Sequence, residues 1–202
     1  MNISLQNAGK RFNRDWIFRH FTSNFLPTQS YAITGPNGSG KSTLLQVIAG
    51  AMLQSEGSLV YTDQHAAVVK EPYLHIAIAA PYLELIEEFT ASEFLKFHEG
   101  FKPLTHSYSE ILEAVNLGNA AGKQIRYFSS GMKQRLKLAQ AFFSDTPVLL
   151  LDEPTSNLDS EGIRLYLKLV AEQIGKRLII VSSNVEEEYA FCGEVINIET
   201  YK

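Results

Sequence analysis

Gly35-Pro36-Asn37-Gly38-Ser39-Gly40-Lys41-Ser42-Thr43 is the stretch that decides the fold of this chain. It has the spacing G-x-x-x-x-G-K-[ST], which is typical of a phosphate-binding loop. Residues 31–34 before it are β-prone, and residues 44–49 after it are apolar at helical spacing. The sequence therefore predicts a strand, a phosphate-binding loop and a helix, in that order.

The residue types in this loop suit a polyphosphate ligand. The glycines allow a tight turn that points backbone N–H groups inward, and the helix that follows adds the positive end of its dipole. We expect Lys41 to reach the β and γ phosphates and the Ser42 hydroxyl to hold Mg²⁺. A glycine-rich turn with a capping lysine is the alternative, and the match at four fixed positions disfavours it. The predicted nucleotide-binding residues of the loop are Asn37, Gly38, Ser39, Gly40, Lys41, Ser42 and Thr43.

Composition limits the class of protein. The chain has 202 residues, of which 45% are hydrophobic, enough for a sizeable α/β core. Its net charge of -4 gives no support to a nucleic-acid-binding face. Cys192 is the single cysteine, so no internal disulfide can form. We predict no secretion signal and no apolar stretch of the roughly 18 residues that a membrane span needs.

The pattern along the chain predicts strands and helices in an order typical of an α/β protein with an inserted helical region. Thr90-Ala91-Ser92-Glu93 has a capping-box signature, and a second amphipathic helix is expected over residues 107–115. Further helices are expected to begin near Lys133, Ser160 and Glu186. The predicted strands span residues 3–5, 16–25, 57–61, 75–80, 148–151, 178–181 and 194–199.

Asp152 and Glu153 follow the continuous apolar run of residues 148–151, which suits a strand buried on both faces. Ligands bind at the carboxyl edge of open α/β sheets, where this strand ends. Asp152 paired with Ser42 is the Mg²⁺ arrangement of phosphate-loop NTPases, and Glu153 is placed to orient an attacking water. An acidic pair that caps a strand end in solvent is the alternative, and the phosphate loop upstream favours the functional reading.

Phe12 lies a strand, a turn and a strand before the phosphate loop. It is a candidate to stack on an adenine ring, because any base offers a π-face to an aromatic side chain. An aromatic side chain packed on the sheet at a hairpin explains Phe12 equally well. The sequence leaves the two possibilities open.

Four segments together resemble the ATP-binding subunit of ABC transporters, in the family's order and spacing. The segments are residues 35–43, 128–135, 149–153 and 156–159. A phosphate loop alone leaves kinases and GTPases open, whereas Ser129-Ser130-Gly131 before a helix, followed by a strand that ends in Asp-Glu, is much more specific. The resemblance covers nearly the whole chain.

The resemblance implies one ABC-type ATP-binding domain over residues 1–202, with a helical subdomain at about 84–135. The implied fold class is α/β, a phosphate-loop NTPase core with a mainly parallel sheet and an antiparallel β subdomain at the N-terminus. Two subunits would share ATP and Mg²⁺ between them, with Ser129, Ser130 and Gly131 presented in trans and Asp159 coupling the sites. The implied partners are a second ATP-binding subunit and a transmembrane permease, which would place the chain in the cytoplasm at the inner face of the membrane.

Two departures from the family pattern bear on catalysis. Ala79-Ala80-Pro81 stands where the family usually carries a glutamine, and Asn184 stands where it usually carries a histidine. Asparagine can donate to a γ-phosphate but cannot carry a charge or shuttle a proton. The predicted catalytic residues are Glu153, Lys41 and Asn184, and slow hydrolysis is expected.

Two other functions compete with a hydrolysing transporter subunit. One is a nucleotide-gated dimer that hardly hydrolyses ATP, which the missing glutamine and histidine favour and Glu153 disfavours. The other is an ABC protein of DNA repair or translation, which usually has tandem domains, coiled-coil insertions or basic arms, and this short acidic chain shows none of them.

The acidic residues Glu84, Glu87 and Glu88 are candidates to receive a basic helix of the permease, or form an ordinary solvated face.

Overall fold

A five-stranded parallel sheet forms the centre of the protein, as a computed structural model of residues 1–202 shows. Its strand order is β5-β6-β7-β3-β8, and a second, antiparallel sheet has the order β2-β1-β4. The strands are β1 (Asn2–Phe12), β2 (Asp15–Phe25), β3 (Ser30–Thr34), β4 (Glu56–Thr62), β5 (Ile76–Ala79), β6 (Val148–Asp152), β7 (Leu178–Ser182) and β8 (Glu194–Asn197). The helices are α1 (Lys41–Ile48), α2 (Ala91–Glu99), α3 (Tyr108–Ala114), α4 (Ser130–Phe142), α5 (Ser160–Ala171) and α6 (Glu186–Tyr189).

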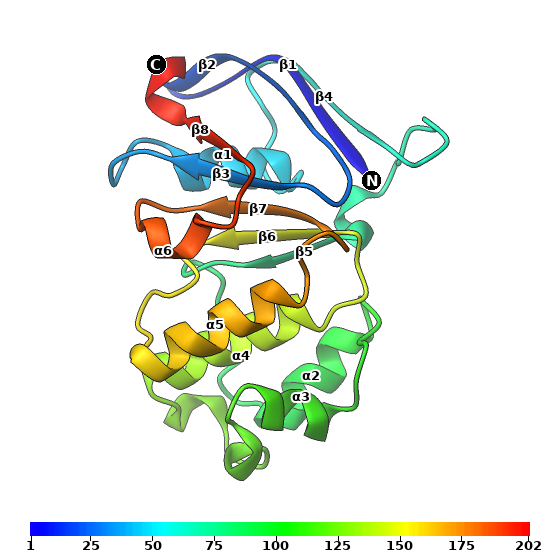
Figure 1. Ribbon diagram of the computed structural model, residues 1–202, viewed down its shortest axis with the longest axis vertical. Helices are drawn as coiled ribbons and strands as arrows, with labels where there is room; N and C mark the ends of the chain where they lie inside the picture. Colours follow the sequence, from blue (N-terminus) through cyan, green and yellow to red (C-terminus); the bar gives the residue numbers. More distant parts are fainter.

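The elements stack in layers on the two faces of the parallel sheet (Figure 1). Helices α4 and α5 cover one face, with α2 and α3 beyond them, and α1 and the antiparallel sheet cover the other. Each face has its own hydrophobic cluster, to which alternate residues of the same strands contribute, such as Leu149 to one and Leu150 to the other. The central strands are therefore buried on both faces, as the apolar runs of β6 and β7 require.

The helix starts that the sequence predicts at Thr90, from its capping-box signature, and near Ser107 are confirmed. Thr90 caps α2 and Ser107 caps α3, and in both the glutamate three residues later, Glu93 or Glu110, bonds back to the cap residue. These reciprocal bonds satisfy backbone groups that a helix start leaves free. The predicted start of α6 at Glu186 is also observed.

Several boundaries differ from the sequence expectation. The first strand extends from Asn2 to Phe12, because register shifts and a positive φ of 47° at Asn7 let one bulged strand continue where the alternating pattern breaks. The helix expected from Lys133 begins at Ser130, because Ser129 caps it through its hydroxyl. His75 lies in a 3₁₀ helix ahead of β5.

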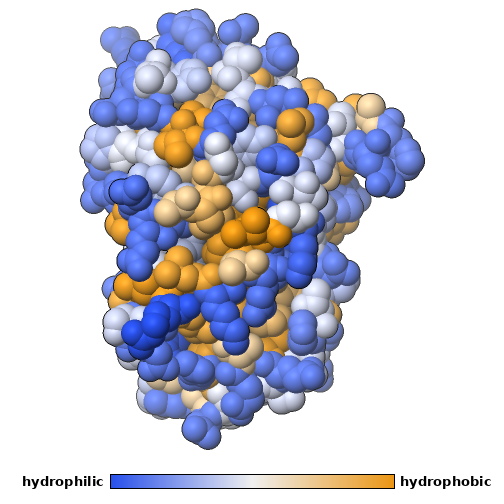
Figure 2. Space-filling view, in the orientation of Figure 1, coloured by the Kyte–Doolittle hydropathy of each residue, from blue (hydrophilic) through white to orange (hydrophobic).

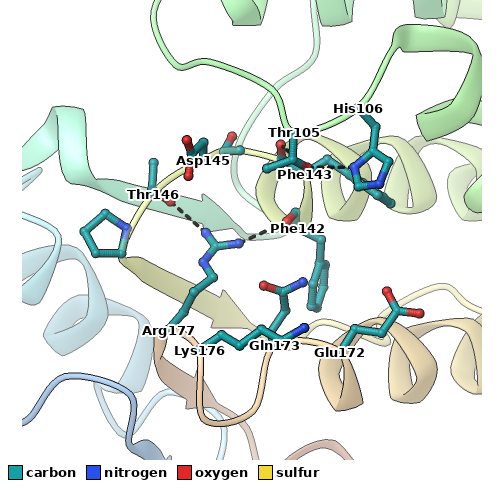
Figure 3. A pocket seen from close by; sticks show the side chains of 12 residues that line it. Thr105, His106, Phe142, Phe143, Asp145, Thr146, Glu172, Gln173, Lys176 and Arg177 are labelled. Carbon is teal, nitrogen blue, oxygen red and sulfur yellow. Dashed lines mark hydrogen bonds between the residues drawn. The ribbon is translucent and has the colours of Figure 1, made fainter.

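Arg177 closes the edge of the sheet opposite the phosphate loop (Figure 3). Arg177 is 7% exposed, and its guanidinium donates to the Phe142 carbonyl at 3.0 Å and to the Thr146 hydroxyl at 2.7 Å. No carboxylate pairs with it, and burial lowers its pKa to about 10. It remains charged at neutral pH, and the carbonyls at the end of α4 stabilise that charge.

Figure 2 shows hydrophilic side chains over the two ends of one face and an oblique apolar band across its middle. No helix has the length and apolar character to cross a membrane.

Cys192 is half-buried beside the hydrophobic cluster to which α5 contributes, and burial raises the pKa of its thiol to about 12.

Candidate active site

The phosphate loop connects β3 to α1, as its sequence predicts, and its glycines have the backbone geometry that the turn requires. Gly38 and Gly40 have φ values of 77° and 100°, in the region that favours glycine. A Cβ on Gly40 would lie 2.4 Å from the Ile17 side chain of β2. The β1–β2 hairpin therefore packs directly against the loop, and only glycine fits at this contact.

The start of α1 presents unpaired hydrogen-bond donors. The backbone N–H groups of Lys41, Ser42 and Thr43 have no acceptor within the chain, and no side chain caps the helix. Lys41 is 3% exposed, and its Nζ donates to the carbonyls of Gly35 at 2.8 Å and Pro36 at 3.1 Å. An ammonium group has three donors, so one remains for a ligand. Free N–H groups, a helix dipole and a positioned lysine together suit a phosphate group.

Asp152 lies at the carboxyl end of β6 and is 1% exposed. Burial raises the pKa of this carboxyl, and the adjacent charge of Glu153 adds to the effect. The hydroxyls of Ser42 and Ser182 and the charge of Lys41 act in the opposite direction. Neither hydroxyl makes a hydrogen bond of good geometry to it, and Asp152 Oδ1 is buried without a partner.

Two buried oxygens without partners lie at the paired ends of β6 and β7, namely Oδ1 of Asp152 and Oγ of Ser182. A third, Oγ of Ser39, is buried within the phosphate loop. Unsatisfied buried oxygens are costly and call for a ligand or ion. Carboxylate and hydroxyl oxygens are the ligands that Mg²⁺ prefers, so Asp152 and Ser42 fit this ion.

Glu153 has the unusual φ of 42°, a value that costs a non-glycine residue conformational energy. Its N–H donates to the Ser182 carbonyl of the neighbouring strand at 2.9 Å. This bond holds the start of the loop at the same sheet edge as Asp152. Non-glycine residues in strained conformations cluster at functional sites.

Asn184 reaches the phosphate loop from the segment after β7. Its Nδ2 donates to Oδ1 of Asn37 at 3.2 Å. The structure thus brings together two predicted site residues that are 147 positions apart in the sequence. The amide of Asn184 is exposed, so it has a further donor to offer to a ligand at the loop.

Tyr82 follows the Ala79-Ala80-Pro81 segment in which no residue could be assigned the role of the missing glutamine. Burial of its hydroxyl and the negative charge of Asp152 raise its pKa. Tyr82 and Gln46 of α1 line one hollow of about 340 Å³. Tyr82 therefore lines this hollow and is near enough to Asp152 for the charge of that carboxylate to affect its hydroxyl.

Residues 129–131, the signature segment at the start of the signature helix α4, line a hollow that contains no residue of the phosphate loop. Ser129, Ser130 and Gly131 surround about 320 Å³ together with Asn157 and Asp159. Arg135 of α4 donates to Asp159 Oδ1 at 3.1 Å, which also accepts from the Gly162 N–H and caps α5. These contacts lower the pKa of Asp159. The signature helix and the segment of Asp159 are thus tied together as one surface.

Phe12 ends β1 at the tip of the hairpin that packs on the phosphate loop, and 46% of its surface is exposed. The Lys10 ammonium lies 5.2 Å from the ring centroid. The ring is exposed enough to stack on a ligand, so Phe12 stays a candidate to contact the adenine ring. Glu87 and Glu88, which the sequence offers as candidates to receive a basic permease helix, are not free. Glu87 forms an ion pair with Lys133, and Glu88 forms one with Arg126.

Sequence reasoning missed two buried polar residues next to this site. Gln134 is 3% exposed and Glu188 is 2% exposed, and both contact the loop that follows Glu153. The helical position of Gln134 and the run of three glutamates that contains Glu188 gave no sign of burial. Only the packing of α4 and α6 against that loop shows their role.

The fold and the site define a phosphate-loop NTPase. The family model for ABC transporters matches residues 18–156, so the chain belongs to the ABC transporter family, of which it is an ATP-binding subunit. The predicted fold class is confirmed as well, since the parallel and antiparallel sheets and the helices are those of an ABC ATPase.

The chain is similar to several known ABC ATP-binding proteins. The cytochrome c biogenesis ATP-binding export protein CcmA of Xylella fastidiosa is 36% identical over 77% of this chain and 70% of that protein. An uncharacterized ABC transporter ATP-binding protein of Bacillus subtilis, YdbJ, is 29% identical over 98% of this chain and 66% of that protein. The solved dimeric ABC transporter cassette MJ0796 shares the fold, with a TM-score of 0.78 and 23% identity over 97% of this chain and 94% of that one.

Proposed function

We propose that this protein hydrolyses ATP and thereby drives a separate transmembrane permease, with Mg²⁺ as cofactor. The main support is the arrangement at the carboxyl edge of the sheet. Free donors of the phosphate loop, the buried and unpartnered oxygen of Asp152 and the neighbouring carboxylate of Glu153 all lie at this edge. Donors for phosphate, a ligand for a divalent cation and a group that can orient water are the parts that phosphoryl transfer to water needs.

The residues act in the following way. Lys41 and the N–H groups of α1 bind the β and γ phosphates, and Asp152 and Ser42 hold the cation, which neutralises phosphate charge when bound. Glu153 accepts a hydrogen bond from the attacking water and orients it in line with the γ-phosphorus. Asn184 donates its amide to a γ-phosphate oxygen. It cannot relay a proton, so turnover is slow.

Two copies of the chain are proposed to share the nucleotides. The hollow at Ser129, Ser130 and Gly131 lies at a helix start and is lined by none of the phosphate-loop residues. Its hydroxyls and N–H groups suit the γ-phosphate of an ATP held by a second copy. The solved MJ0796 cassette is dimeric, which supports this arrangement.

The permease is proposed to dock at the hollow that Tyr82 and Gln46 line. Seven of its ten lining residues are hydrophobic, among them Tyr73, Ile78 and Leu83. An apolar hollow suits the apolar face of a cytoplasmic permease helix better than the internally paired Glu87 and Glu88 do. A Leu83→Glu variant should keep phosphate release and lose sedimentation with membranes of the native cells. Equal sedimentation of variant and wild type would refute this site.

Steady-state phosphate release from Mg·ATP tests the hydrolytic function. We expect Glu153→Gln to reduce release by about a hundredfold or more, because the group that orients water is lost. The same variant should elute as a dimer in size-exclusion chromatography with ATP. Release by the wild type that is no faster than that of the variant would contradict hydrolysis by the isolated chain and favour a nucleotide-gated dimer.

A further inference from the structure

Glu188 carries a buried carboxylate to which the proposed chemistry assigns no role. It lies on α6, four residues after Asn184, and is 2% exposed, whereas Glu186 and Glu187 beside it are exposed. No cation pairs with it. A buried carboxylate without a cation depends on hydrogen bonds for its stability.

The hydrogen bonds of Glu188 go to the loop that carries Glu153. Its Oε1 accepts from the Thr155 N–H at 2.8 Å and also from the Thr155 hydroxyl. Pro154 has no N–H, so Thr155 offers the first backbone donor after Glu153. The other carboxylate oxygen is buried and has no partner. The Thr155 contacts are therefore what holds this carboxylate.

Two further side chains complete a clamp around the same loop. Gln134 of α4 donates to the Pro154 carbonyl at 2.8 Å. Tyr166 of α5 is fully buried and donates to the backbone carbonyl of Glu188 at 2.6 Å. The loop is thus held from the signature helix on one side and from α6 on the other, and α5 fixes the position of α6.

The strained φ of 42° at Glu153 gives this clamp a consequence for the site. A strained backbone persists only where its surroundings over-determine it. The bonds from Gln134 and Glu188 to the next two residues are such constraints. If they are lost, Glu153 can relax toward an ordinary φ, and its carboxylate moves with the backbone.

We propose that Glu188 is a positioning residue for hydrolysis. It holds the backbone of residues 153–155 so that Glu153 faces the attacking water, and it ties this loop to the segment that carries Asn184. This inference rests on the proposed hydrolytic function. A purely structural role for Glu188 would lower stability and leave the catalytic rate of the folded protein unchanged.

The test combines amide hydrogen exchange with kinetics on Glu188→Ala. We expect exchange in residues 153–158 to accelerate by about tenfold or more. The kcat for phosphate release should fall by about tenfold or more, with KM for ATP within about threefold of the wild type. Glu187→Ala is the matched control on the same helix and should change neither quantity. Glu188→Gln keeps an acceptor for the Thr155 N–H and should restore most of kcat.

A double variant shows whether Glu188 acts through Glu153. In the Glu153→Gln background, Glu188→Ala should cause no further loss of the residual turnover, since residues that act as a unit are not additive. Unchanged exchange in Glu188→Ala, or faster exchange with unchanged kcat, would overturn the proposal. A wild type without turnover that depends on Glu153 would instead contradict the proposed function, and the exchange rates would then decide whether Glu188 holds the loop.

Discussion

Asp152 shows at the scale of one residue how function opposes stability. Its carboxyl is buried, one of its oxygens has no partner, and its pKa is raised. A group whose pKa is higher in the folded than in the unfolded state favours folding while it is protonated. That stabilisation is lost as pH rises from the unfolded pKa through the folded one. At neutral pH the nucleotide-free protein therefore bears the full cost of this charge.

Replacement of Asp152 by asparagine should relieve this cost. We expect Asp152→Asn to raise the midpoint of thermal unfolding at about pH 7.5, by about 2–4 °C for each kcal/mol gained. The gain should shrink as pH is lowered into the acid range, because the wild-type carboxyl, whose pKa is raised, then takes up its proton. The same variant should lose Mg²⁺-dependent phosphate release.

Asp15→Asn is a suitable control, because Asp15 is exposed and makes no ion pair. Differential scanning calorimetry over this pH range makes the measurement. A lower midpoint for Asp152→Asn at neutral pH would show that the contacts with Lys41 and Ser42 outweigh burial.

At the scale of elements, the sequence predicted what local chemistry determines. The phosphate loop, the capping box at Thr90 and the apolar strand before Asp152 follow from the types of neighbouring residues. The placement of Asn184 beside Asn37 could not be read locally, because it depends on the parallel pairing of β3 with β7. Glu188, Gln134 and Arg177 escaped notice for the same reason, since each contacts backbone groups of another element.

Arg177 offers a test of such a contact between elements. It donates to carbonyls at the C-terminal end of α4 from the start of β7. We expect Arg177→Met to lower the free energy of unfolding by about 2–4 kcal/mol, because buried carbonyls lose a charged donor. Chemical denaturation measures the change. Lys176→Met serves as control, because Lys176 is exposed and lines the hollow in Figure 3 together with Arg177.

The effect of Arg177→Met should be on stability alone, since the residue lies at the sheet edge opposite the phosphate loop. ATP affinity at a temperature where the variant is folded should match the wild type. Equal destabilisation by the two variants would mean that the bonds to α4 contribute nothing beyond the loss of a surface charge.

At the scale of the whole molecule, the proposal that two copies share each site can be tested, because no residue of the phosphate loop lines the hollow at Ser129, Ser130 and Gly131. Lys41→Ala disables the phosphate loop. Ser130→Glu places a negative charge at the exposed start of α4, where it repels the phosphates of ATP held by the second copy. Each variant alone should be inactive. Mixed in equal amounts, half of the dimers contain both variants and retain one intact site, so about a quarter of the wild-type rate should return.

Phosphate release by the mixture, compared with each variant measured separately, makes this test. An acidic residue suits a helix start, so Ser130→Glu should fold normally and a circular dichroism melt should confirm it. A mixture as inactive as its components would contradict sites shared between copies.

The shielded thiol of Cys192 has a practical consequence for watching such an assembly. Because its pKa is about 12, the sulfur remains protonated at neutral pH and reacts slowly with maleimide dyes. A cysteine introduced at an exposed position would therefore take up a fluorophore selectively, without prior removal of the native one. Energy transfer between donor- and acceptor-labelled copies could then report closure and reopening in real time.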